Sequence, residues 1–466
     1  MKMSNIQLPA HVVYTLYHLK EHGFEAYVVG GYIRDNLIRQ SKTQLVNANL
    51  DTTTKDVDIT TSATTEDVVR LFKNVRRIDS KGRTVLVVFG DAHTLEVSTF
   101  QGENIKEDLG NRDFTINSFA MDIDKNITYS SKSCIKDLYH GYIDVNNDDV
   151  FDKDPLRMMR AVRFSHFMDF VIEPYVVDAI KDKAAKIKEV APERIKAELC
   201  KALIFPKIGS TSGYFRELNE LGLLEHILPE LHRCVGFNQH NPNHDKCVFE
   251  HSLDVVDYMP NYLSGKLAAL LHDVGKAVTF TQEENGVGHF YGHDVAGAQI
   301  TAQIMTRFKF SDALISRVVK LVGHHHQGDW QQGNNSLARF ISSVGQENLS
   351  LLFRLKMADA KAKSKESKEE RLHEVRKLAM MVNTFMEKEI PLKVTGLAVN
   401  GKDVIDCGFE VGPKIGSVLR ELLSAVIAGT VANNRDALLL LICELKLKDT
   451  ASLNTILGGR GVGQLN

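Results

Sequence analysis

Several features that would narrow the class of this protein are missing from its sequence. No apolar run is long enough to cross a membrane, and the first residues, MKMSNIQLPAHVVYTLYHLKEHG, contain no signal-peptide core. None of the 6 cysteines forms a C-x-x-C pair, which indicates free thiols in a reducing compartment. The formal net charge of −2 gives no overall attraction to nucleic acid, so such binding requires local basic surfaces. We therefore expect a soluble cytoplasmic protein, and its 466 residues predict several domains.

What the sequence does contain is a pair of aspartates inside a β-branched run, TTTKDVDITTS, at residues 52–62. Successive side chains of a strand point to opposite faces. Val57 and Ile59 can therefore be buried while Asp56 and Asp58 lie side by side on the other face. Adjacent carboxylates repel each other unless a cation lies between them, which favours a divalent metal. A polar strand face, or an aspartate that caps the next element, is the alternative.

Just upstream, the stretch AYVVGGYIRDNLI (residues 26–38) predicts a buried strand, a turn at Gly30 and Gly31, and a helix that starts near Tyr32. The free N–H groups and the positive end of such a helix form a cradle for an anion. A tight turn without a ligand is the alternative. A phosphate cradle next to a metal pair favours nucleotidyl transfer, because that chemistry depends on positioned phosphates and on cations that neutralise charge.

A third carboxylate is available in HTLEVSTF (residues 93–100), which alternates like a strand. Leu95 and Val97 share one face of this strand, and Glu96 lies on the other. If the strand is a neighbour of the aspartate strand, Glu96 joins Asp56 and Asp58. An exposed strand glutamate is an equally supported alternative.

Four motifs follow one another in the order found in bacterial class II CCA-adding enzymes and the related poly(A) polymerases: VVGGYIRDNLI, KDVDITTSAT, EDLGNRDFTINSFAMD and KDPLRMMRAVRF. The chain resembles this family from about Tyr27 to beyond Phe164. The resemblance implies a polymerase-β-like head followed by helical regions, with Mg²⁺ held by Asp56 and Asp58. The nucleotide-binding residues that it implies are Gly30, Gly31, Arg34, Arg112, Asp113 and Asn117.

The last of these motifs predicts a helix, with Asp154 and Arg157 on one face and Arg160 and Arg163 continuing a basic stripe. An aspartate accepts a hydrogen bond from an exocyclic amino group, and an arginine donates one to a ring nitrogen. Cytosine and adenine both present that pair of groups, whereas uracil and guanine present the opposite polarity. Asp154 and Arg157 can thus select CTP and ATP without a nucleic-acid template, the role that the family motif E-D-x-x-R assigns them. A surface salt bridge on a solvated face is the alternative.

Two residues depart from the family pattern. Lys153 stands where the motif has glutamate, which leaves the orientation of Arg157 open. Asn111 stands where the family has the first arginine of R-R-D. Neither change removes a metal ligand, but the choice among CCA, CC, A and poly(A) as the product stays open.

The middle of the chain carries a spaced series of histidines and aspartates in FEHSLDVVDY, AALLHDVGKA, YGHDVAGA, LVGHHHQ and RLKMADAKAKS. Neutral imidazoles and carboxylates suit Mn, Fe, Ni, Co or Zn. The series resembles the HD phosphohydrolase superfamily, whose members bind one or two metals and hydrolyse phosphate esters. The residues that we select are the core ligands His251, His272, Asp273 and Asp359, the second-metal candidates His293 and His324, with His325 an equal choice to His324, and Lys276 for a phosphate.

CCA-adding enzymes with such a domain have implied activities on 2′,3′-cyclic phosphates and on 2′- or 3′-phosphates. A damaged RNA end needs a free 3′-hydroxyl before it can be extended, so both activities would serve one substrate end. An HD fold that has lost its activity, and a homodimer formed through this domain, are open alternatives.

After Asp359, the charged run DAKAKSKESKEERLHEVRKLAMM predicts a solvated helical connection. The stretches VNGKDVI and GPKIGSVLREL then predict two short helices. They resemble the tail of many CCA-adding enzymes, where it contacts the tRNA elbow. Lys402, Lys414 and Arg420 are candidate phosphate contacts, although an ordinary surface charge explains each of them better when taken singly.

The prediction is an α+β protein: a polymerase-β-like nucleotidyltransferase head with a mixed sheet, followed by all-α neck, HD and tail regions. The expected domains are the head at 1–148, the neck and body at 149–230, the HD domain at 231–362 and the tRNA-binding tail at 363–466. The expected function is template-independent addition of CCA to tRNA from CTP and ATP, with phosphohydrolase activity on RNA 3′-end phosphates. A poly(A) polymerase or a CC-only or A-only enzyme is the nearest alternative. A hydrolase with a relic head and a non-catalytic tRNA chaperone represent other classes.

Overall fold

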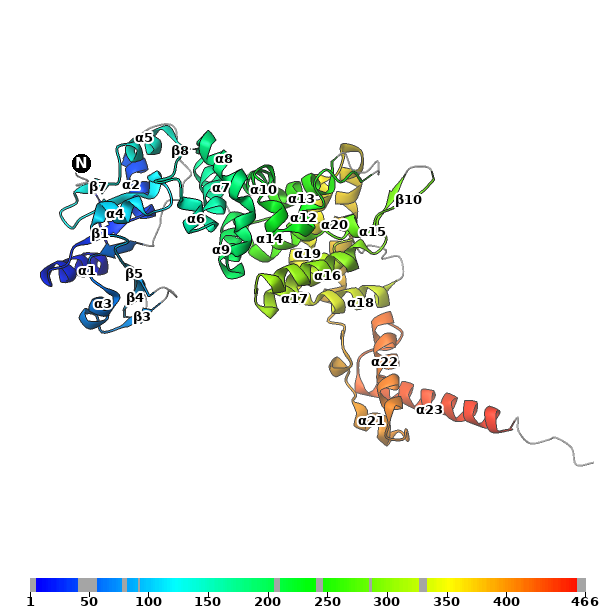
Figure 1. Cartoon of the computed structure of the whole chain (residues 1–466). Coiled ribbons are helices and arrows are strands. Elements are labelled where there is room, and N and C mark those ends of the chain that lie inside the picture. Colours follow the sequence, from blue (N-terminus) through cyan, green and yellow to red (C-terminus); the bar gives the residue numbers. More distant parts are fainter. Residues whose placement is uncertain are drawn as a thin grey trace, which may run out of the picture. The chain divides into compact units, whose positions relative to one another are not determined.

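Figure 1 shows the computed structural model of the chain. It describes residues 6–40, 57–77, 82–90, 93–204, 210–239, 246–284, 287–326 and 333–458. The chain forms two compact units, Met1–His232 with Arg307–Lys309, and Arg233–Thr306 with Phe310–Asn466. Among the described helices, none has the length and apolar character that a membrane crossing requires.

A mixed sheet is the centre of the first unit. Within the described residues its strand order is β3-β4-β5-β2-β1-β6-β7, and β2 and β5 form its parallel pair. The strands are β1 (Ala26–Val29), β2 (Asp58–Thr61), β3 (Val75–Arg77), β4 (Thr84–Phe89), β5 (His93–Thr99), β6 (Phe119–Met121) and β7 (Ile127–Tyr129). The helices around them are α1 (Ala10–Glu21), α2 (Gly31–Gln40), α3 (Thr65–Leu71), α4 (Ile105–Gly110), η1 (Thr115–Asn117) and α5 (Ser133–His140). This arrangement confirms the predicted α+β head.

The register of the sheet separates a wholly apolar row from a row that contains two carboxylates. Val28, Ile59, Val97 and Val85 are successive partners across four strands, and each is at most 1% exposed. Because side chains alternate along a strand, the next row points to the opposite face. That row places Asp58 of β2 directly beside Glu96 of β5.

The rest of the first unit is helical apart from β8 (Tyr142–Ile143) and β9 (Val171–Ile172). Its helices are α6 (Val150–Lys153), α7 (Leu156–Met168), α8 (Pro174–Lys183), η2 (Ala184–Glu189), α9 (Pro192–Leu203), α10 (Ser210–Glu220), α11 (Leu224–Ile227) and α12 (Pro229–His232). The predicted helix after Asp154 is α7, and Leu156, Met159 and Val162 are buried as expected.

The second unit is almost wholly helical, as predicted. Its first helices are α13 (Val248–Tyr258), α14 (Leu263–Leu271), α15 (Lys276–Thr279), α16 (His293–Arg307), α17 (Asp312–His324), α18 (Asn334–Val344), α19 (Gln346–Ala362) and α20 (Lys365–Glu387), with the short strands β10 (Thr281–Gln282) and β11 (Gly288–His289). Its last elements are η3 (Val394–Gly396), α21 (Gly401–Asp406), α22 (Pro413–Ala428) and α23 (Arg435–Gly458). These last elements have their own core, in which Val404, Leu422, Leu438 and Ile442 are fully buried.

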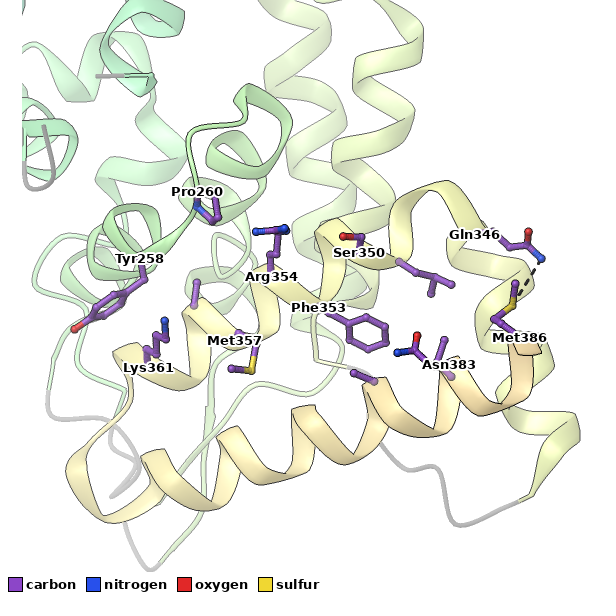
Figure 2. A pocket seen from close by; sticks show the side chains of 14 residues that line it. Tyr258, Pro260, Gln346, Ser350, Phe353, Arg354, Met357, Lys361, Asn383 and Met386 are labelled. Carbon is purple, nitrogen blue, oxygen red and sulfur yellow. Dashed lines mark hydrogen bonds between the residues drawn. The ribbon is translucent and has the colours of Figure 1, made fainter. Parts of the chain in front are cut away.

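The prediction of a merely solvated connection after Asp359 is wrong for the second half of that segment. Helix α20 packs along α19, and Leu372 and Leu378 of this segment, like Val382 and Phe385 just after it, are at most 5% exposed. These apolar residues recur at helical spacing within a highly charged sequence, so one face is buried and the other is solvated. A cavity of about 690 Å³ remains between the two helices and the C-terminal end of α13, and Figure 2 shows Phe353 of α19 among the residues that line it.

Candidate functional site

The first candidate site lies where β1 ends and α2 begins. Gly30 has φ +75°, a conformation that residues with a Cβ rarely adopt. A Cβ at Gly30 would lie 3.4 Å from Oδ2 of Asp58 and 3.9 Å from Nη1 of Arg112. The glycine therefore lets the turn approach a carboxylate and a guanidinium that come from two other elements. Glu96 lies beside Asp58 in the sheet, while Asp56 is outside the described residues.

A chain of hydrogen bonds connects the head to helix α7. Arg34 is buried, and its Nη1 donates to Oδ1 of Asn117 at 2.7 Å. Asn117 Nδ2 donates to Oδ1 of Asp113 at 3.0 Å. Nε and Nη2 of Arg160 donate to the other oxygen of Asp113, at 2.9 and 2.6 Å. Four of the predicted site residues are thus held in one network, which fixes α7 against η1.

The charge of Asp113 is stabilised by this network. Burial by itself raises the pKa of Asp113, but the charge of Arg160 and the hydrogen bonds from Asn117 and Arg160 outweigh it and lower the pKa to about 2. The ring of Phe164 lies beside the network, 5.2 Å from the guanidinium carbon of Arg34 and 5.3 Å from that of Arg160. The arginines are therefore positioned by both ion pairing and stacking.

Asp154 and Arg157 have different partners from the ones that the sequence suggests. Both carboxylate oxygens of Asp154 accept hydrogen bonds from Arg194 of α9, at 3.1 and 2.7 Å. Nη2 of Arg157 donates to the backbone oxygen of Asn111 at 3.1 Å. Its Nη1 is buried and has no hydrogen-bond partner among the described residues, so it is available as a donor. Lys153 pairs with Asp149 at 3.0 Å.

The basic stripe expected on α7 is largely neutralised. Glu198 of α9 accepts a hydrogen bond from Nε of Arg163 at 2.5 Å and lies 3.5 Å from Nη1 of Arg160. Arg163 is 9% exposed. Its nucleotide contact stays a prediction, and the contact that the structure shows is with the neck helix α9.

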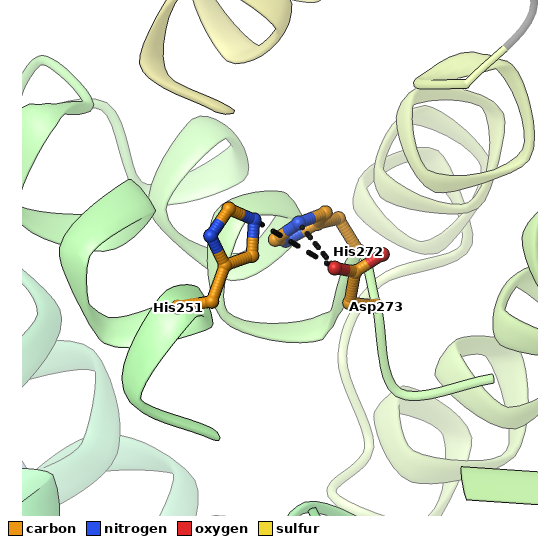
Figure 3. A group of neighbouring side chains, drawn as sticks. All are labelled: His251, His272 and Asp273. Atoms are coloured by element: carbon orange, nitrogen blue, oxygen red, sulfur yellow. Dashed lines mark ion pairs between the residues drawn. The ribbon is translucent and has the colours of Figure 1, made fainter. Parts of the chain in front are cut away.

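The second candidate site combines four helices and the turn after α14. Nε2 of His251 lies 2.9 Å from Oδ1 of Asp359, and Nε2 of His272 lies 3.2 Å from Oδ2 of Asp273. Figure 3 shows His251, His272 and Asp273 converging. On the other side of Asp273, Nε2 of His293 and Nε2 of His325 lie 3.7 and 3.5 Å from its Oδ1. Two groups of potential metal ligands therefore share Asp273.

Three of the four imidazoles, those of His272, His293 and His325, are held with Nδ1 on a backbone oxygen, which leaves Nε2 for a metal. Nδ1 of His272, His293 and His325 lies within 2.8 Å of the backbone oxygen three residues earlier. A carbonyl can only accept, so Nδ1 carries the proton and the lone pair of Nε2 faces Asp273. Nε2 of both His272 and His293 is buried without a hydrogen-bond partner among the described residues. Burial also lowers the pKa of His325 to about 4, which keeps it neutral.

The structure chooses between two adjacent histidines. His325, and not His324, belongs to the ligand group, because the helix phase turns His324 toward Phe340, with ring centroids 6.2 Å apart. Lys276 is buried, with Nζ 2.7 Å from Oδ2 of Asp273 and donating to Gln239 at 2.8 Å. The phosphate contact of Lys276 stays a prediction. The contact that the structure shows is with Asp273, the aspartate that the two ligand groups share.

Sequence reasoning missed Arg194, Glu198, Phe164 and Gln239. Each acts through a contact with a residue at least 35 positions away, and for Phe164 that residue is Arg34. The clearest available signal was the apolar spacing of PERIKAELCKAL (residues 192–203), which marks a helix with a buried face. A glutamate on such a face requires a cationic partner.

Three family models match successive parts of the chain. Residues 26–150 match the Poly A polymerase head domain, residues 169–235 match the probable RNA and SrmB-binding site of polymerase A, and residues 248–379 match the HD domain. The A-adding tRNA nucleotidyltransferase of Deinococcus radiodurans is 32% identical over 346 residues, which are 72% of this chain and 78% of that protein.

Two further comparisons span nearly the whole chain. The CC-adding tRNA nucleotidyltransferase of Thermus thermophilus is 29% identical over 442 residues, 92% of this chain and 94% of that protein. The crystal structure of the Bacillus stearothermophilus CCA-adding enzyme in complex with CTP aligns with a TM-score of 0.66 over 96% of this chain and 100% of that one. At 23% identity, this likeness shows that the two chains share a fold.

Proposed function

The chain belongs to the tRNA nucleotidyltransferase and poly(A) polymerase family, and we propose that it adds CCA to the 3′ end of tRNA from CTP and ATP. The observation that carries the proposal is the convergence of Gly30, Asp58, Glu96 and Arg112 around the central strands β1, β2 and β5 of the head sheet. In this reaction the 3′-hydroxyl oxygen of the RNA bonds to the α-phosphorus of the nucleotide. The bond from that phosphorus to the bridging oxygen breaks, and pyrophosphate leaves.

The residues of the head have separate tasks in this proposal. Gly30 and Gly31 present backbone N–H groups to the triphosphate, and Arg112 adds positive charge beside them. Asp58 and Glu96, with Asp56, supply the oxygen ligands that Mg²⁺ prefers. When bound, Mg²⁺ neutralises triphosphate charge and favours the ionised 3′-oxygen. Arg34, Asp113 and Asn117 contact the nucleotide near its ribose and phosphates, and their mutual hydrogen bonds hold them in place.

The base would be read by Asp154 and Arg157. Asp154 accepts from the exocyclic amino group of cytosine or adenine, and the unpartnered Nη1 of Arg157 donates to the ring nitrogen. Arg194 orients the carboxylate of Asp154 from the side. Position 153, where the family motif has glutamate, is lysine in this chain. The backbone oxygen of Asn111 orients Arg157 instead. Arg160 and Arg163 support this helix through Asp113 and Glu198.

The test uses purified protein with Mg²⁺ and three tRNAs, which end at the discriminator base, at C and at CC. Each is incubated with CTP, ATP or both, and products are resolved at single-nucleotide length. The proposal predicts that, with both nucleotides present, every substrate is extended to CCA and no further. The Asp58→Asn variant must lose addition, and the exposed Glu103→Gln change serves as the matched control.

A more restricted specificity is the second candidate, because the relatives named above include an A-adding and a CC-adding enzyme. Under that alternative, the tRNA ending at CC gains only A, or the tRNA ending at the discriminator base gains only CC. A long A ladder would instead identify a poly(A) polymerase.

We also propose that the HD domain hydrolyses phosphates at RNA 3′ ends, including 2′,3′-cyclic phosphates. The support is the pair of ligand groups that share Asp273, with buried Nε2 atoms directed at it. This donor set of imidazoles and carboxylates fits Ni, Mn, Co, Fe or Zn. When bound, such an ion supplies an activated water and a Lewis acid. Lys276 remains beside Asp273 to counter the negative charge of the phosphate.

The hydrolase proposal is tested with an RNA that ends in a 2′,3′-cyclic phosphate, in the presence of each metal in turn. Hydrolysis should disappear in Asp273→Asn and persist in Asp58→Asn, whereas nucleotide addition should show the reverse. A protein that binds metal but releases no phosphate from any of these ends would rule out the activity. A homodimer through this domain stays a prediction.

A further inference from the structure

A groove between α18 and α20 stands out in the second unit because its charge is of one sign. Its volume is about 640 Å³, and none of its described lining residues is Asp or Glu. Four lining residues of α20 or its C-terminal end carry basic side chains: His373, Arg376, Lys377 and Lys388. This concentration contrasts with the net charge of −2 for the whole chain.

The three strong cations of this groove are not neutralised by the protein. Arg376, Lys377 and Lys388 are exposed and form no ion pair within the described part of the chain. On the same helix but outside the groove, Arg371 pairs with Glu374 at 2.8 Å. Unpaired cations that flank a concave surface without carboxylates favour an anionic partner.

Between the cations lies an apolar strip. Met380 is 69% exposed, although Leu378 and Val382 of the same helix are buried, and Phe385 forms part of the groove floor. At about 1.5 Å per residue, Lys377 and Lys388 are roughly 17 Å apart along the helix axis. The protein surface thus has positive charge at both ends and an apolar strip in the middle. This pattern matches a shallow groove of a nucleic acid duplex, which has sugars at its centre and a row of phosphates on each side.

We propose that the groove between α18 and α20 binds the backbone of duplex RNA across its minor groove. The A-form minor groove is wide and shallow, displays riboses, and is recognised mainly through its shape and its phosphates. Arg376, Lys377 and Lys388 contact phosphates, and Met380 lies against the riboses. The inference rests on the proposed function, whose tRNA substrate contains such a duplex, and it adds a contact that lies on the HD-domain side of the chain, outside the segment matched as RNA-binding.

The test compares two triple variants of the full-length protein. The groove variant is Arg376→Glu, Lys377→Glu and Lys388→Glu. The control variant, with the same change in charge, is Lys368→Glu, Arg371→Glu and Lys393→Glu, at positions that do not line the groove. Circular dichroism and the thermal midpoint establish that both variants fold.

The groove variant should raise KM for tRNA by about 10-fold or more and leave KM for CTP and kcat unchanged. Its plot of log Kd for tRNA against log salt should be shallower by about two to three units, since each lost phosphate contact removes roughly one. A third variant, in which Arg376, Lys377 and Lys388 are all replaced by Gln, should show the same shallower slope. Because glutamine is neutral, this variant separates the loss of phosphate contacts from the repulsion that glutamates add. The control should behave like the wild type.

Equal tRNA affinity in the groove and control variants would overturn the inference. The inference would also be overturned if the groove variant bound RNA normally but lost binding to vesicles of anionic phospholipid. That result would assign the groove to a membrane surface. Failure of the wild type to extend tRNA would reject the proposed function, while the direct Kd measurement would still decide whether the groove binds duplex RNA.

Discussion

Replacement of Asp113 by asparagine tests the network that joins the head to α7. The pKa of Asp113 falls from an ordinary 3.8 to about 2, a difference of roughly 2 units, and each unit corresponds to about 1.4 kcal/mol. The ionised carboxylate therefore contributes on the order of 2–3 kcal/mol to the folded state. An asparagine amide at this position cannot satisfy Nε and Nη2 of Arg160 and also accept from Asn117, so this contribution is lost.

Hydrogen exchange at pH 7 on the full-length protein measures this effect locally, in peptides from η1 and α7. Asp113→Asn should lower their opening free energy by about 2–3 kcal/mol. In an Arg160→Met background the same change should cost less than about 1 kcal/mol, because the charge partner is already gone. An equal cost in both backgrounds would refute the reasoning.

The same network predicts the sign of a pH effect. A carboxyl group with a depressed pKa stabilises the folded state above its ordinary pKa, and the contribution disappears as the pH falls toward the folded-state value. The difference in urea midpoint between wild type and Asp113→Asn should therefore be constant from pH 7 to about 5 and shrink between about pH 4 and 2. A difference that grows on acidification would contradict the assignment.

Three other predictions follow from single contacts. Arg194→Ala should raise UTP misincorporation about 10-fold relative to CTP, because Asp154 loses the partner that orients it; unchanged discrimination in a primer-extension assay would exclude that role. Gly275→Ala should reduce bound metal per chain and cost about 1–3 kcal/mol in HD-domain stability, since a Cβ there would lie 2.1 Å from the backbone oxygen of His293; normal metal content by mass spectrometry would argue against this packing. His325→Ala should bind less metal per chain, whereas His324→Ala should bind as much as the wild type. The reverse result would identify His324 as the ligand.

The parts of the site that lie within one strand or one turn could be predicted from the sequence. Alternation in β2 and β5 placed Asp58 and Glu96 on polar faces, and the sheet register makes them neighbours. The glycine turn likewise follows from local conformational preference, because Gly30 has positive φ. These features depend on the backbone period and on few distant contacts.

The partners of charged side chains could not be predicted in the same way. Asp154 and Arg157 share a helical spacing, yet Asp154 pairs with Arg194, 40 positions later, and Arg157 with a backbone oxygen. Helix packing decides such pairings, and the sequence does not record the packing directly. The choice of His325 over His324 depends in the same way on the phase of one helix end.

Nucleotide addition to tRNA that ends at the discriminator base tests the central claim most directly. With Mg²⁺, CTP and ATP, the protein is expected to add three nucleotides in the order C, C, A and then stop, and Asp58→Asn is expected to add none. Addition by Asp58→Asn at the wild-type rate, or a wild type that binds this tRNA without extending any of its forms, would contradict the account.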